Sequence, residues 1–565
     1  MTLQRTALCS LISLSLAALG FACSPAVTDG QVGGSGGGPT QSSGGMGSGS
    51  GGGGPLGTGG GVGVGGVPGG TGGAPNLGTG GAPGVGGAPG VGGAPGSGGA
   101  PPVVVVRPAL ITSAQGPGCA PTLAGCSYWK TDGAVTESTG AAEVTVSDTT
   151  RQTFVGFGGS FNEEGWQNLL QLTPAEQQKA VALLFDAADG ARFVYGRIPI
   201  GASDYAVAPR YSLQESATAE FSIARDKNLL IPFINAAKAV NPNIHFWGSP
   251  WSPPPWMKTN SDYDGGNMTN SPAMLQAHAD YLANFVTHYA AEGITIEAVH
   301  PQNEPGFLQT YPSCGWDGPL MADYIANYLG PTFEEQGITA QIFIGTMSNS
   351  SKDGAVLQAV MANAKAKSYV KGYGLQWGML GSVGSLGLDS SLQIWQTEHK
   401  CGNYPFDGQS QAPGIPGNVT THQSSAPNDH AYAEESWGLL REWIKAGVTS
   451  YSAWNMVLDS VGVGEIDTQR TWAQNALLTV NLGAKTLNLT PTYFVFRHIS
   501  QYVDPGATRL DTSGGDALAF KNLDGSVTTI LYNNGATKDV TVSVLGKTLS
   551  FSLPGRGWAT LNVGP

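Results

Sequence analysis

The sequence predicts a (β/α)8 barrel of the TIM type followed by a small antiparallel β-sandwich. After residue 151, eight short runs of β-branched and aromatic residues alternate with helical stretches, a pattern typical of parallel strands joined by crossover helices. After Pro491, shorter runs alternate apolar and polar residues between turn residues, which is typical of antiparallel hairpins. The glycine excess belongs to neither part, because 37 of the 85 glycines lie between Gly30 and Gly99.

Residues 1–22 predict a signal peptide. Arg5 is followed by an apolar run from Ala7 to Phe21, which is too short to be a good membrane span. We therefore expect an exported protein, located outside the cell or on its surface. The residues before Cys23 resemble a lipoprotein signal, so Cys23 is a candidate for acylation and membrane attachment, and simple secretion is the alternative.

The composition of residues 23–118 predicts a Gly- and Pro-rich tether. Residues 30–101 repeat Gly-Gly-Ala-Pro with Val, Thr or Ser between, and this composition buries too little apolar surface to fold. The glycines keep no strict three-residue period, which excludes a collagen helix. Residues 119–151 follow as an N-terminal segment, in which the run 142–147 is expected to add a strand to the side β domain.

Residues 152–490 predict the barrel. The strand candidates are 152–161, 192–200, 244–251, 296–304, 341–348, 372–377, 392–398 and 450–458. Helical patterns between them include 174–186, 272–292 and 434–446; the first begins with Thr173 and Pro174 as N-cap and first helical residue, and the last is closed by Gly447. Eight such repeats are the number that closes a TIM barrel.

Residues 491–565 predict the side domain, an antiparallel β-sandwich. Its strand candidates are 517–521, 527–532, 539–545, 548–553 and 557–563. Turn residues separate them, as at Asp524-Gly525 and Asn533-Asn534-Gly535.

The charge balance limits the classes of partner. Charged residues make up 12% of the chain, and 40 acidic against 27 basic residues give a net charge of −13. A nucleic-acid partner is disfavoured, because such proteins need clustered Lys and Arg. Thirteen Trp and eighteen Tyr beside so few charges favour an uncharged polar ligand. We expect a monomer.

Four cysteines remain beyond the leader, in an exported chain where disulfides are chemically permitted. They are Cys119, Cys126, Cys314 and Cys401, and they allow three connectivities. The short spacing favours a bridge between Cys119 and Cys126, which leaves Cys314 and Cys401 as a second pair; free buried thiols are the alternative. No metal-binding motif occurs, so we expect no metal and no cofactor.

Two carboxylates occupy the positions where a barrel places its chemistry. Polar residues at the C-terminal ends of barrel strands face the active site. The fourth predicted strand ends at Glu304 and the seventh at Glu398, on opposite sides of one barrel mouth. Glycoside hydrolysis requires such a pair, because one carboxyl protonates the leaving oxygen while the other stays ionised.

Tryptophans near the same strand ends fit sugar recognition. The proline-rich segment 249–258 follows the third strand and is expected to hold Trp251 and Trp256 at the rim, where sugar rings stack on indoles. Trp377 lies at the end of the sixth strand and is a further candidate.

Six motifs occur in a fixed order along the chain. They are GFGGSF at 156–161, RIPIGASD at 197–204, SPW at 249–251, NEP at 303–305, TE at 397–398 and SAWN at 452–455. Asn-Glu-Pro alone is shared by many barrel glycosidases, whereas the ordered set is specific. Together the motifs resemble glycoside hydrolase family 30, the glucosylceramidase-like retaining glycosidases, from residue 152 to the C-terminus.

The resemblance implies roles for individual residues. Glu304 corresponds to the acid/base and Glu398 to the nucleophile. Asn303 corresponds to a ligand of the sugar's 2-hydroxyl group, and Arg197 to the cation that holds Glu398 ionised. The residues implied to line the subsite of the transferred sugar are Asp204, Trp251, Trp454 and Asn455, and Trp377 is added to them here.

Retention implies a short separation between the two carboxyl groups. Retaining glycosidases hold them about 5 to 5.5 Å apart. At that range an ionised Glu398 disfavours a second negative charge, so we expect Glu304 to keep its proton near neutral pH. The reaction is then a double displacement that needs no cofactor.

The sequence leaves the substrate open. It departs from the family pattern at Asn162-Glu163-Glu164, where relatives often carry an Asp, and at Gln396, where many carry an aromatic residue. The resemblance allows glucosylceramide-like substrates, other β-glucosides, β-1,6-glucans or galactans and xylans, with exo or endo action. A non-catalytic glycan-binding surface protein is the alternative; it would keep the tryptophans but need not keep both carboxylates.

Overall fold

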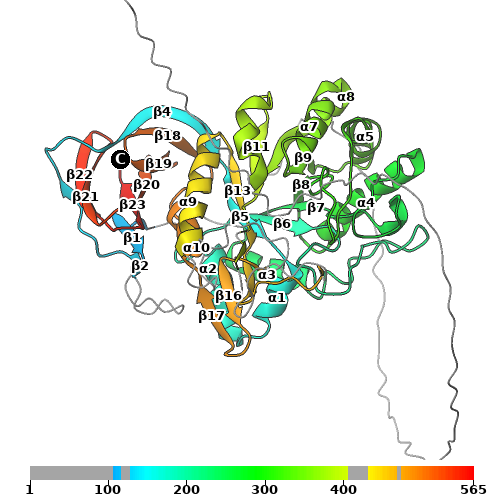
Figure 1. Cartoon of the computed structure of the whole chain (residues 1–565), viewed down its shortest axis with the longest axis horizontal. Helices are drawn as coiled ribbons and strands as arrows, with labels where there is room; N and C mark the ends of the chain where they lie inside the picture. The colour runs from blue at the N-terminus through cyan, green and yellow to red at the C-terminus, as the bar shows by residue number, and fades with distance from the viewer. Residues whose placement is uncertain (1–105, 116–126, 402, 405–429, 468–472) are drawn as a thin grey trace, which may run out of the picture. The chain divides into compact units, whose positions relative to one another are not determined.

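A computed structural model describes residues 106–115, 127–401, 403–404, 430–467 and 473–565 (Figure 1). These residues contain a closed barrel of eight parallel strands and a ten-stranded sheet. Two smaller sheets of two and three strands accompany them. The barrel with a β-rich C-terminal part is the fold class that the sequence predicts.

The barrel strands follow one another along the chain, and each pairs in parallel with the next. They are β5 (Gly156–Ser160), β6 (Tyr195–Pro199), β7 (His245–Ser249), β8 (Ile296–Val299), β9 (Gln341–Met347), β10 (Val370–Gln376), β11 (Gln393–Glu398) and β13 (Ser450–Asn455). β13 pairs with β5 and closes the barrel. All eight predicted strands are present, but β8 ends at Val299, so Glu304, which was predicted to end this strand, lies five residues beyond it.

Aromatic side chains fill the barrel interior. Phe343 of β9 and Trp395 of β11 lie 4.2 Å apart between ring centroids, and Trp247 of β7 lies 4.5 Å from His300. All four side chains are buried. Trp247, Phe343 and Trp395 each precede a polar residue near the end of their own strand by two or three positions. This aromatic layer therefore lies below those polar residues and closes the barrel beneath them.

Helices connect the barrel strands. They are α1 (Glu163–Leu169), α2 (Pro174–Phe185), α3 (Leu230–Val240), α4 (Pro272–Ala291), α5 (Gly318–Tyr324), α6 (Gly330–Glu335), α7 (Lys352–Ala362), α8 (Ala364–Tyr369) and α9 (His430–Lys445), with the 3-10 helices η1 (Pro255–Met257) and η3 (Trp377–Ser385) and the π-helix η2 (Ile325–Leu329). Thr173 and Ser271 cap α2 and α4 through their side-chain oxygens, each just before a proline. The three predicted helices are confirmed. Across the described parts of the chain, no helix is both long and apolar enough to span a membrane.

The ten-stranded sheet combines strands from before and after the barrel. Its spatial order is β2 (Ser127–Lys130), β1 (Leu110–Ala114), β23 (Gly557–Val563), β20 (Val527–Asn533), β19 (Asp516–Lys521), β18 (Ala507–Ser513), β4 (Val144–Phe154), β21 (Lys538–Val544), β22 (Lys547–Leu553) and β3 (Thr136–Glu137). The five predicted hairpin strands and the predicted N-terminal strand are present. The smaller sheets pair β12 (Asn403–Tyr404) with β15 (Ala473–Gln474), and β14 (Val457–Asp459) with β16 (Leu478–Asn481) and β17 (Thr486–Leu489).

The strands β1, β2, β3 and β18 of the ten-stranded sheet and the helix α10 beside it were not predicted. β1 lies within the segment that was predicted to be tether. Leu110–Ala114 pairs along its whole length with β23, so this part of the segment belongs to the sheet. β18 pairs with both β4 and β19. Residues 491–500 form a helix, α10 (Pro491–Ser500), in which every residue is buried, so that the C-terminal segment begins with a helix before its strands.

We expect Gly158→Ala to destabilise the barrel. Its new Cβ would lie 2.0 Å from the backbone oxygen of Tyr195, where β5 and β6 approach most closely, and backbone atoms there cannot move aside. Overpacking of this kind costs about 1–3 kcal/mol or more. Gly438→Ala is the matched control: nothing lies within 4 Å of that Cβ on α9, so it should stabilise by about 0.5–1 kcal/mol. Denaturant unfolding of both variants measures the difference, and equal stabilities would contradict the expectation.

Candidate active site

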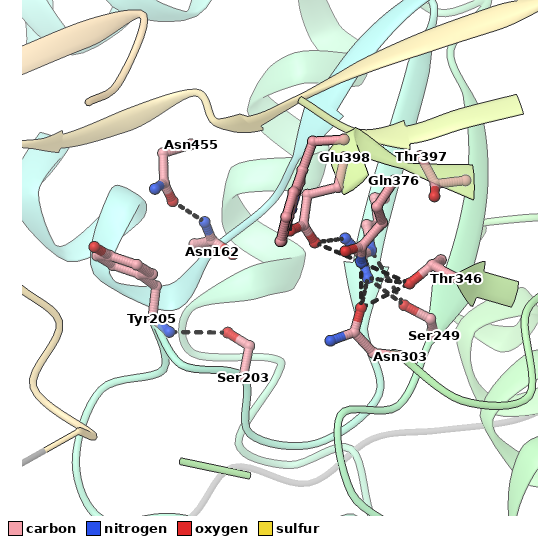
Figure 2. A network of polar contacts seen from close by, with 12 residues as sticks. Asn162, Ser203, Tyr205, Ser249, Asn303, Thr346, Gln376, Thr397, Glu398 and Asn455 are labelled. Carbon is pink, nitrogen blue, oxygen red and sulfur yellow. Dashed lines mark hydrogen bonds and ion pairs between the residues drawn. The ribbon is translucent and has the colours of Figure 1, made fainter. Parts of the chain in front are cut away.

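The guanidinium of Arg197 is the centre of a hydrogen-bond network at the mouth of the barrel. Arg197 lies on β6, and its side chain is completely buried. Its Nη1 donates to Glu398 Oε2 at 2.5 Å, and its Nη2 donates to Asn303 Oδ1 at 2.7 Å. Nε and Nη2 both donate to Ser249 Oγ at 3.1 Å. Figure 2 shows these partners gathering from neighbouring strand ends around one point.

Glu398 is the last residue of β11 and is 8% exposed. Besides Arg197, Gln376 Nε2 donates to its Oε2 at 3.1 Å, and Trp377 Nε1 donates to its Oε1 at 3.4 Å. Burial raises the pKa of Glu398, and the charge and hydrogen bond of Arg197 oppose that rise. The ion pair therefore supports the charged form of a carboxylate that burial alone would neutralise.

Asn303 is held in one orientation by three donors. Arg197 Nη2, Thr346 Oγ1 and Gln376 Nε2 all donate to its Oδ1, at 2.7, 2.7 and 2.8 Å. Three hydrogen bonds to the oxygen fix the amide, and its nitrogen points away from the cluster (Figure 2). That nitrogen is a donor placed for a ligand hydroxyl.

Glu304 stands in the segment after β8, close to Arg197. Its side chain is buried, with 7% of the residue exposed, and it lies close enough to Arg197 that a charge on Glu304 raises the pKa of the guanidinium against the effect of burial. Its backbone takes the left-handed conformation, with φ of 49°, and its N–H donates to the carbonyl oxygen of Thr346 at 2.8 Å. The short carboxyl separation implied by retention stays a prediction.

The predicted tryptophans take two different positions. Trp251 and Trp454 are both buried and stack on each other with ring centroids 5.2 Å apart. The Arg197 guanidinium lies 4.2 Å from the centroid of the Trp251 ring, a cation–π contact. Trp251 therefore packs against the cation and does not form the open rim that was predicted for it. Trp256 and Trp377 are only partly buried.

Asn455 belongs to a second polar chain in Figure 2. Asn162 Nδ2 donates to Asn455 Oδ1 at 2.8 Å, as Figure 2 shows. Asn455 Nδ2 in turn donates to Gln474 Oε1 at 2.9 Å. Asn162 follows β5 and Asn455 ends β13, so this chain lies where the barrel closes.

Two further carboxyl groups near the site are held in their neutral forms. Burial, with the charge of Glu398 as the next cause, raises the pKa of Asp204 to about 8. Burial raises the pKa of Glu164 to about 9, although it accepts a hydrogen bond from the Glu465 N–H. Asp204 Oδ1 is buried and has no hydrogen-bond partner among the described residues, which leaves it available to a ligand hydroxyl.

Sequence reasoning missed several members of the network. Ser249, Thr346 and Gln376 all bond to Arg197 or Glu398, and Glu164 shares the field of Asp204. A signal for three of them existed, because Ser249, Thr346 and Gln376 each lie within one residue of the C-terminal end of a barrel strand. Gln396, singled out as a departure, donates through Nε2 to the backbone oxygen of Glu398.

The predicted disulfide between Cys314 and Cys401 is wrong. Both residues are buried thiols. Cys314 packs in the segment after β8, beside Lys258, whereas the Cys401 carbonyl accepts from the Asn475 N–H near β13. The two cysteines therefore belong to loops of different strands. Cys23, Cys119 and Cys126 lie outside the described residues.

The described side chains offer acid/base groups and no metal cage. No group of three or more His, Cys, Asp and Glu within the described ranges is arranged to hold a metal ion. The arrangement instead supplies an ion-paired carboxylate, a second carboxylate near the same cation, and fixed amide and hydroxyl groups. These are the groups required to cleave a bond at a sugar's anomeric carbon.

Comparisons with known proteins agree with this geometry. Residues 154–503 match the glycosyl hydrolase family 30 TIM-barrel domain, and residues 506–561 match the family 30 beta sandwich domain. Endo-1,6-beta-D-glucanase neg1 of Aspergillus fumigatus is 25% identical over 448 residues, covering 72% of this chain and 84% of its own. Lysosomal acid glucosylceramidase of Mus musculus is 23% identical over 448 residues, covering 70% and 78%. The structure of the endo-beta1,6-glucanase BT3312 superposes with a TM-score of 0.66 at 22% identity, covering 80% of this chain and 98% of that one.

The barrel, its carboxylates and the side sheet are those of a glycoside hydrolase. The family match extends over most of the chain and includes both the barrel and the side domain. This chain belongs to glycosyl hydrolase family 30.

We expect Glu164→Gln to stabilise the protein more at pH 8 than at pH 5. The pKa of Glu164 is about 9 in the folded chain, against about 4.3 for a glutamate in water. Between these values folding takes up a proton, so stability falls as pH rises. Gln keeps an acceptor for the Glu465 N–H and does not titrate. The Tm gain over the parent should be about 2 °C or more at pH 8 and smaller at pH 5. The exposed Glu220→Gln is the control, and equal gains at both pH values would contradict this assignment.

Proposed function

We propose that this protein is a retaining β-glycosidase in which Glu398 is the nucleophile and Glu304 the general acid/base. The ion pair between Arg197 and Glu398 carries this proposal. A nucleophilic carboxylate must be ionised, and in a buried site a neighbouring cation and hydrogen-bond donors support that form. Glu304 lies in the field of the same guanidinium, in the segment after β8.

The contacts of Glu398 suggest which of its oxygens attacks. Oε2 accepts from Arg197 and Gln376, whereas Oε1 accepts only the 3.4 Å contact from Trp377. Oε1 therefore forms the bond to the anomeric carbon while the bond to the leaving oxygen breaks. Glu304 gives its proton to that oxygen. Water then attacks the anomeric carbon, Glu304 takes the water's proton, and Glu398 leaves as a carboxylate, so the β configuration is retained.

The remaining polar groups bind the sugar in the subsite next to Glu398. The Asn303 amide nitrogen donates to the 2-hydroxyl, in a position fixed by the three hydrogen bonds on its oxygen. A protonated Asp204 both donates to and accepts from hydroxyl groups, which an ionised carboxylate cannot do. Trp377 and Asn455 complete the lining, and Trp251 and Trp454 hold Arg197 in place.

We infer a β-glucoside as the substrate. The relatives' names, endo-1,6-beta-D-glucanase and glucosylceramidase, both denote hydrolysis of glucosyl linkages. The two names differ in the leaving group, a glucan in one and ceramide in the other, so the sugar next to Glu398 is the common part. The signal-like leader and Cys23 support action outside the cytoplasm, with a lipid on Cys23 as the membrane attachment.

Replacement of the nucleophile should abolish turnover and leave the fold intact. Glu398→Gln keeps the side-chain volume and removes the attacking charge, so we expect at least a ~10⁴-fold loss of kcat on an aryl β-glucoside, in line with loss of a covalent nucleophile. The parent enzyme should release the β-anomer first, as followed by NMR. Glu220→Gln is the control for a surface carboxylate. Substantial turnover by Glu398→Gln, or release of the α-anomer, would exclude the retaining assignment.

Removal of the cation should shift the acidic limb of the pH profile. Arg197→Met leaves Glu398 buried without its counter-charge, so the pKa of Glu398 rises further and the nucleophile ionises only at higher pH. The acidic limb of kcat/KM should move to higher pH, together with a loss of about 2–5 kcal/mol of transition-state stabilisation. Arg197→Lys keeps the charge and should shift the limb less. An unchanged limb in a folded Arg197→Met enzyme would exclude this role of the ion pair.

A further inference from the structure

Asp353 forms an unusual buried contact directly beside the segment that carries Glu304. Asp353 lies in the first turn of α7 and is completely buried. Its Oδ1 accepts the Gly306 N–H at 2.6 Å, and its Oδ2 accepts the N–H groups of Ser348 and Asn349 at 2.6 and 3.0 Å. One carboxylate therefore joins the segment after β8 to the segment after β9.

The hydrogen-bond ladder between β8 and β9 does not by itself join these two segments. β8 ends at Val299, and its register with β9 consists of Ala298 with Gln341 and Val299 with Ile342. Past Val299, single backbone bonds reach β9 from the Gln302 N–H to Gly345 O at 3.4 Å and from the Glu304 N–H to Thr346 O at 2.8 Å, while β9 continues to Met347. Glu304 is thus joined to β9 by its own N–H, and two residues later the bond between Gly306 and Asp353 joins the same segment to α7.

The backbone at Glu304 needs such support. A non-glycine residue with φ of 49° is in a sparsely populated region and stays there only where its surroundings hold it. Gly306 has no side chain because none fits: a Cβ would lie 2.3 Å from Asp353 Oδ1 and 2.6 Å from the Cβ of Lys352. The close approach of this loop to α7 therefore depends on both Gly306 and Asp353.

We propose that Asp353 is a positioning residue that holds Glu304 in the geometry for proton transfer to the leaving group. The proposal rests on the assignment of Glu304 as the acid/base. Asp353 touches neither substrate nor reacting atoms in this scheme. Its loss lets the 304–306 segment relax, and Glu304 then misses the leaving oxygen while Glu398, held by Arg197 from the other side, still attacks.

Aryl β-glucosides that differ in their leaving group separate this role from a general loss of structure. Phenolate has a pKa of about 10 and leaves only when it is protonated, whereas 2,4-dinitrophenolate leaves without a proton. In Asp353→Asn, kcat/KM on phenyl β-glucoside should fall by at least about tenfold, within the range that general acid catalysis contributes. On 2,4-dinitrophenyl β-glucoside it should fall less than threefold.

Gly306→Ala is a second variant that disturbs the same contact from the other side. Its Cβ displaces Asp353 Oδ1, so it should show the same selective loss on the phenyl substrate. Ser348→Ala is the matched control, because it removes only the 3.3 Å contact of Ser348 Oγ with Asp353 and leaves the bond to Gly306. It should behave as the parent on both substrates.

Added azide gives an independent readout. When acid/base assistance is weak, azide attacks the anomeric carbon of the glucosyl-enzyme, the bond to Glu398 breaks, and β-glucosyl azide forms without proton abstraction. The folded Asp353→Asn or Gly306→Ala enzyme should form this product with the dinitrophenyl substrate, and the parent should form little. Equal losses on both substrates, or no loss on either, would overturn the role of Asp353. A parent enzyme that hydrolyses neither glucoside would instead refute the proposed function.

Discussion

The ion pair between Arg197 and Glu398 is the interaction on which the rest of the site depends. A buried guanidinium and carboxylate stabilise a protein only when their remaining donors and lone pairs are satisfied. Ser249 and Asn303 meet this requirement for Arg197, and Gln376 meets it for Glu398. These partners come from β7, from the segment after β8 and from β10, so the geometry of the ion pair depends on the closure of the barrel. A strand displaced by one residue would turn a partner away from the pair.

Several carboxyl groups of the site lie near the Arg197 guanidinium. Burial raises the pKa values of Asp204 and Glu164 to about 8 and about 9, so near neutral pH both carry protons. The negative charge is thereby concentrated at Glu398, which has the guanidinium as its direct partner. The neutral carboxyls contribute hydrogen-bonding groups without repelling the nucleophile. A polar but uncharged lining suits sugar hydroxyls, whereas additional ionised carboxylates would oppose ionisation of Glu398.

The sequence determines the barrel more completely than it determines the site. All eight barrel strands follow from short β-branched and aromatic runs that alternate with helical stretches. Glu398 follows from its place at the end of β11, whereas Glu304 lies five residues beyond β8. Thr346 and Gln376 are ordinary polar residues whose importance depends on distances across the barrel. The predicted bridge between Cys314 and Cys401 fails for the same reason, since counting cysteines carries no information on which loops meet. β18 was not predicted because its sequence, ATRLDTS, has few apolar residues from which a strand could be recognised.

The side sheet supports the wall of the barrel next to Glu398. β4 leads into β5 through Val155 alone, so the sheet and the barrel share one continuous stretch of chain. Helix α9 lies in the chain between β11, which ends at Glu398, and β13, and Trp437 on this helix donates to Asp516 of the sheet at 3.0 Å. His498 of the buried helix α10 lies 2.8 Å from Thr560 of β23. Burial lowers the pKa of His498 to about 3, so this contact stays uncharged across the range in which the carboxyls titrate. Ion pairs also join Glu434 of α9 to Arg556 and Arg441 of α9 to Asp516. The sheet therefore restrains α9 through charged as well as neutral contacts, and α10 through the neutral contact of His498.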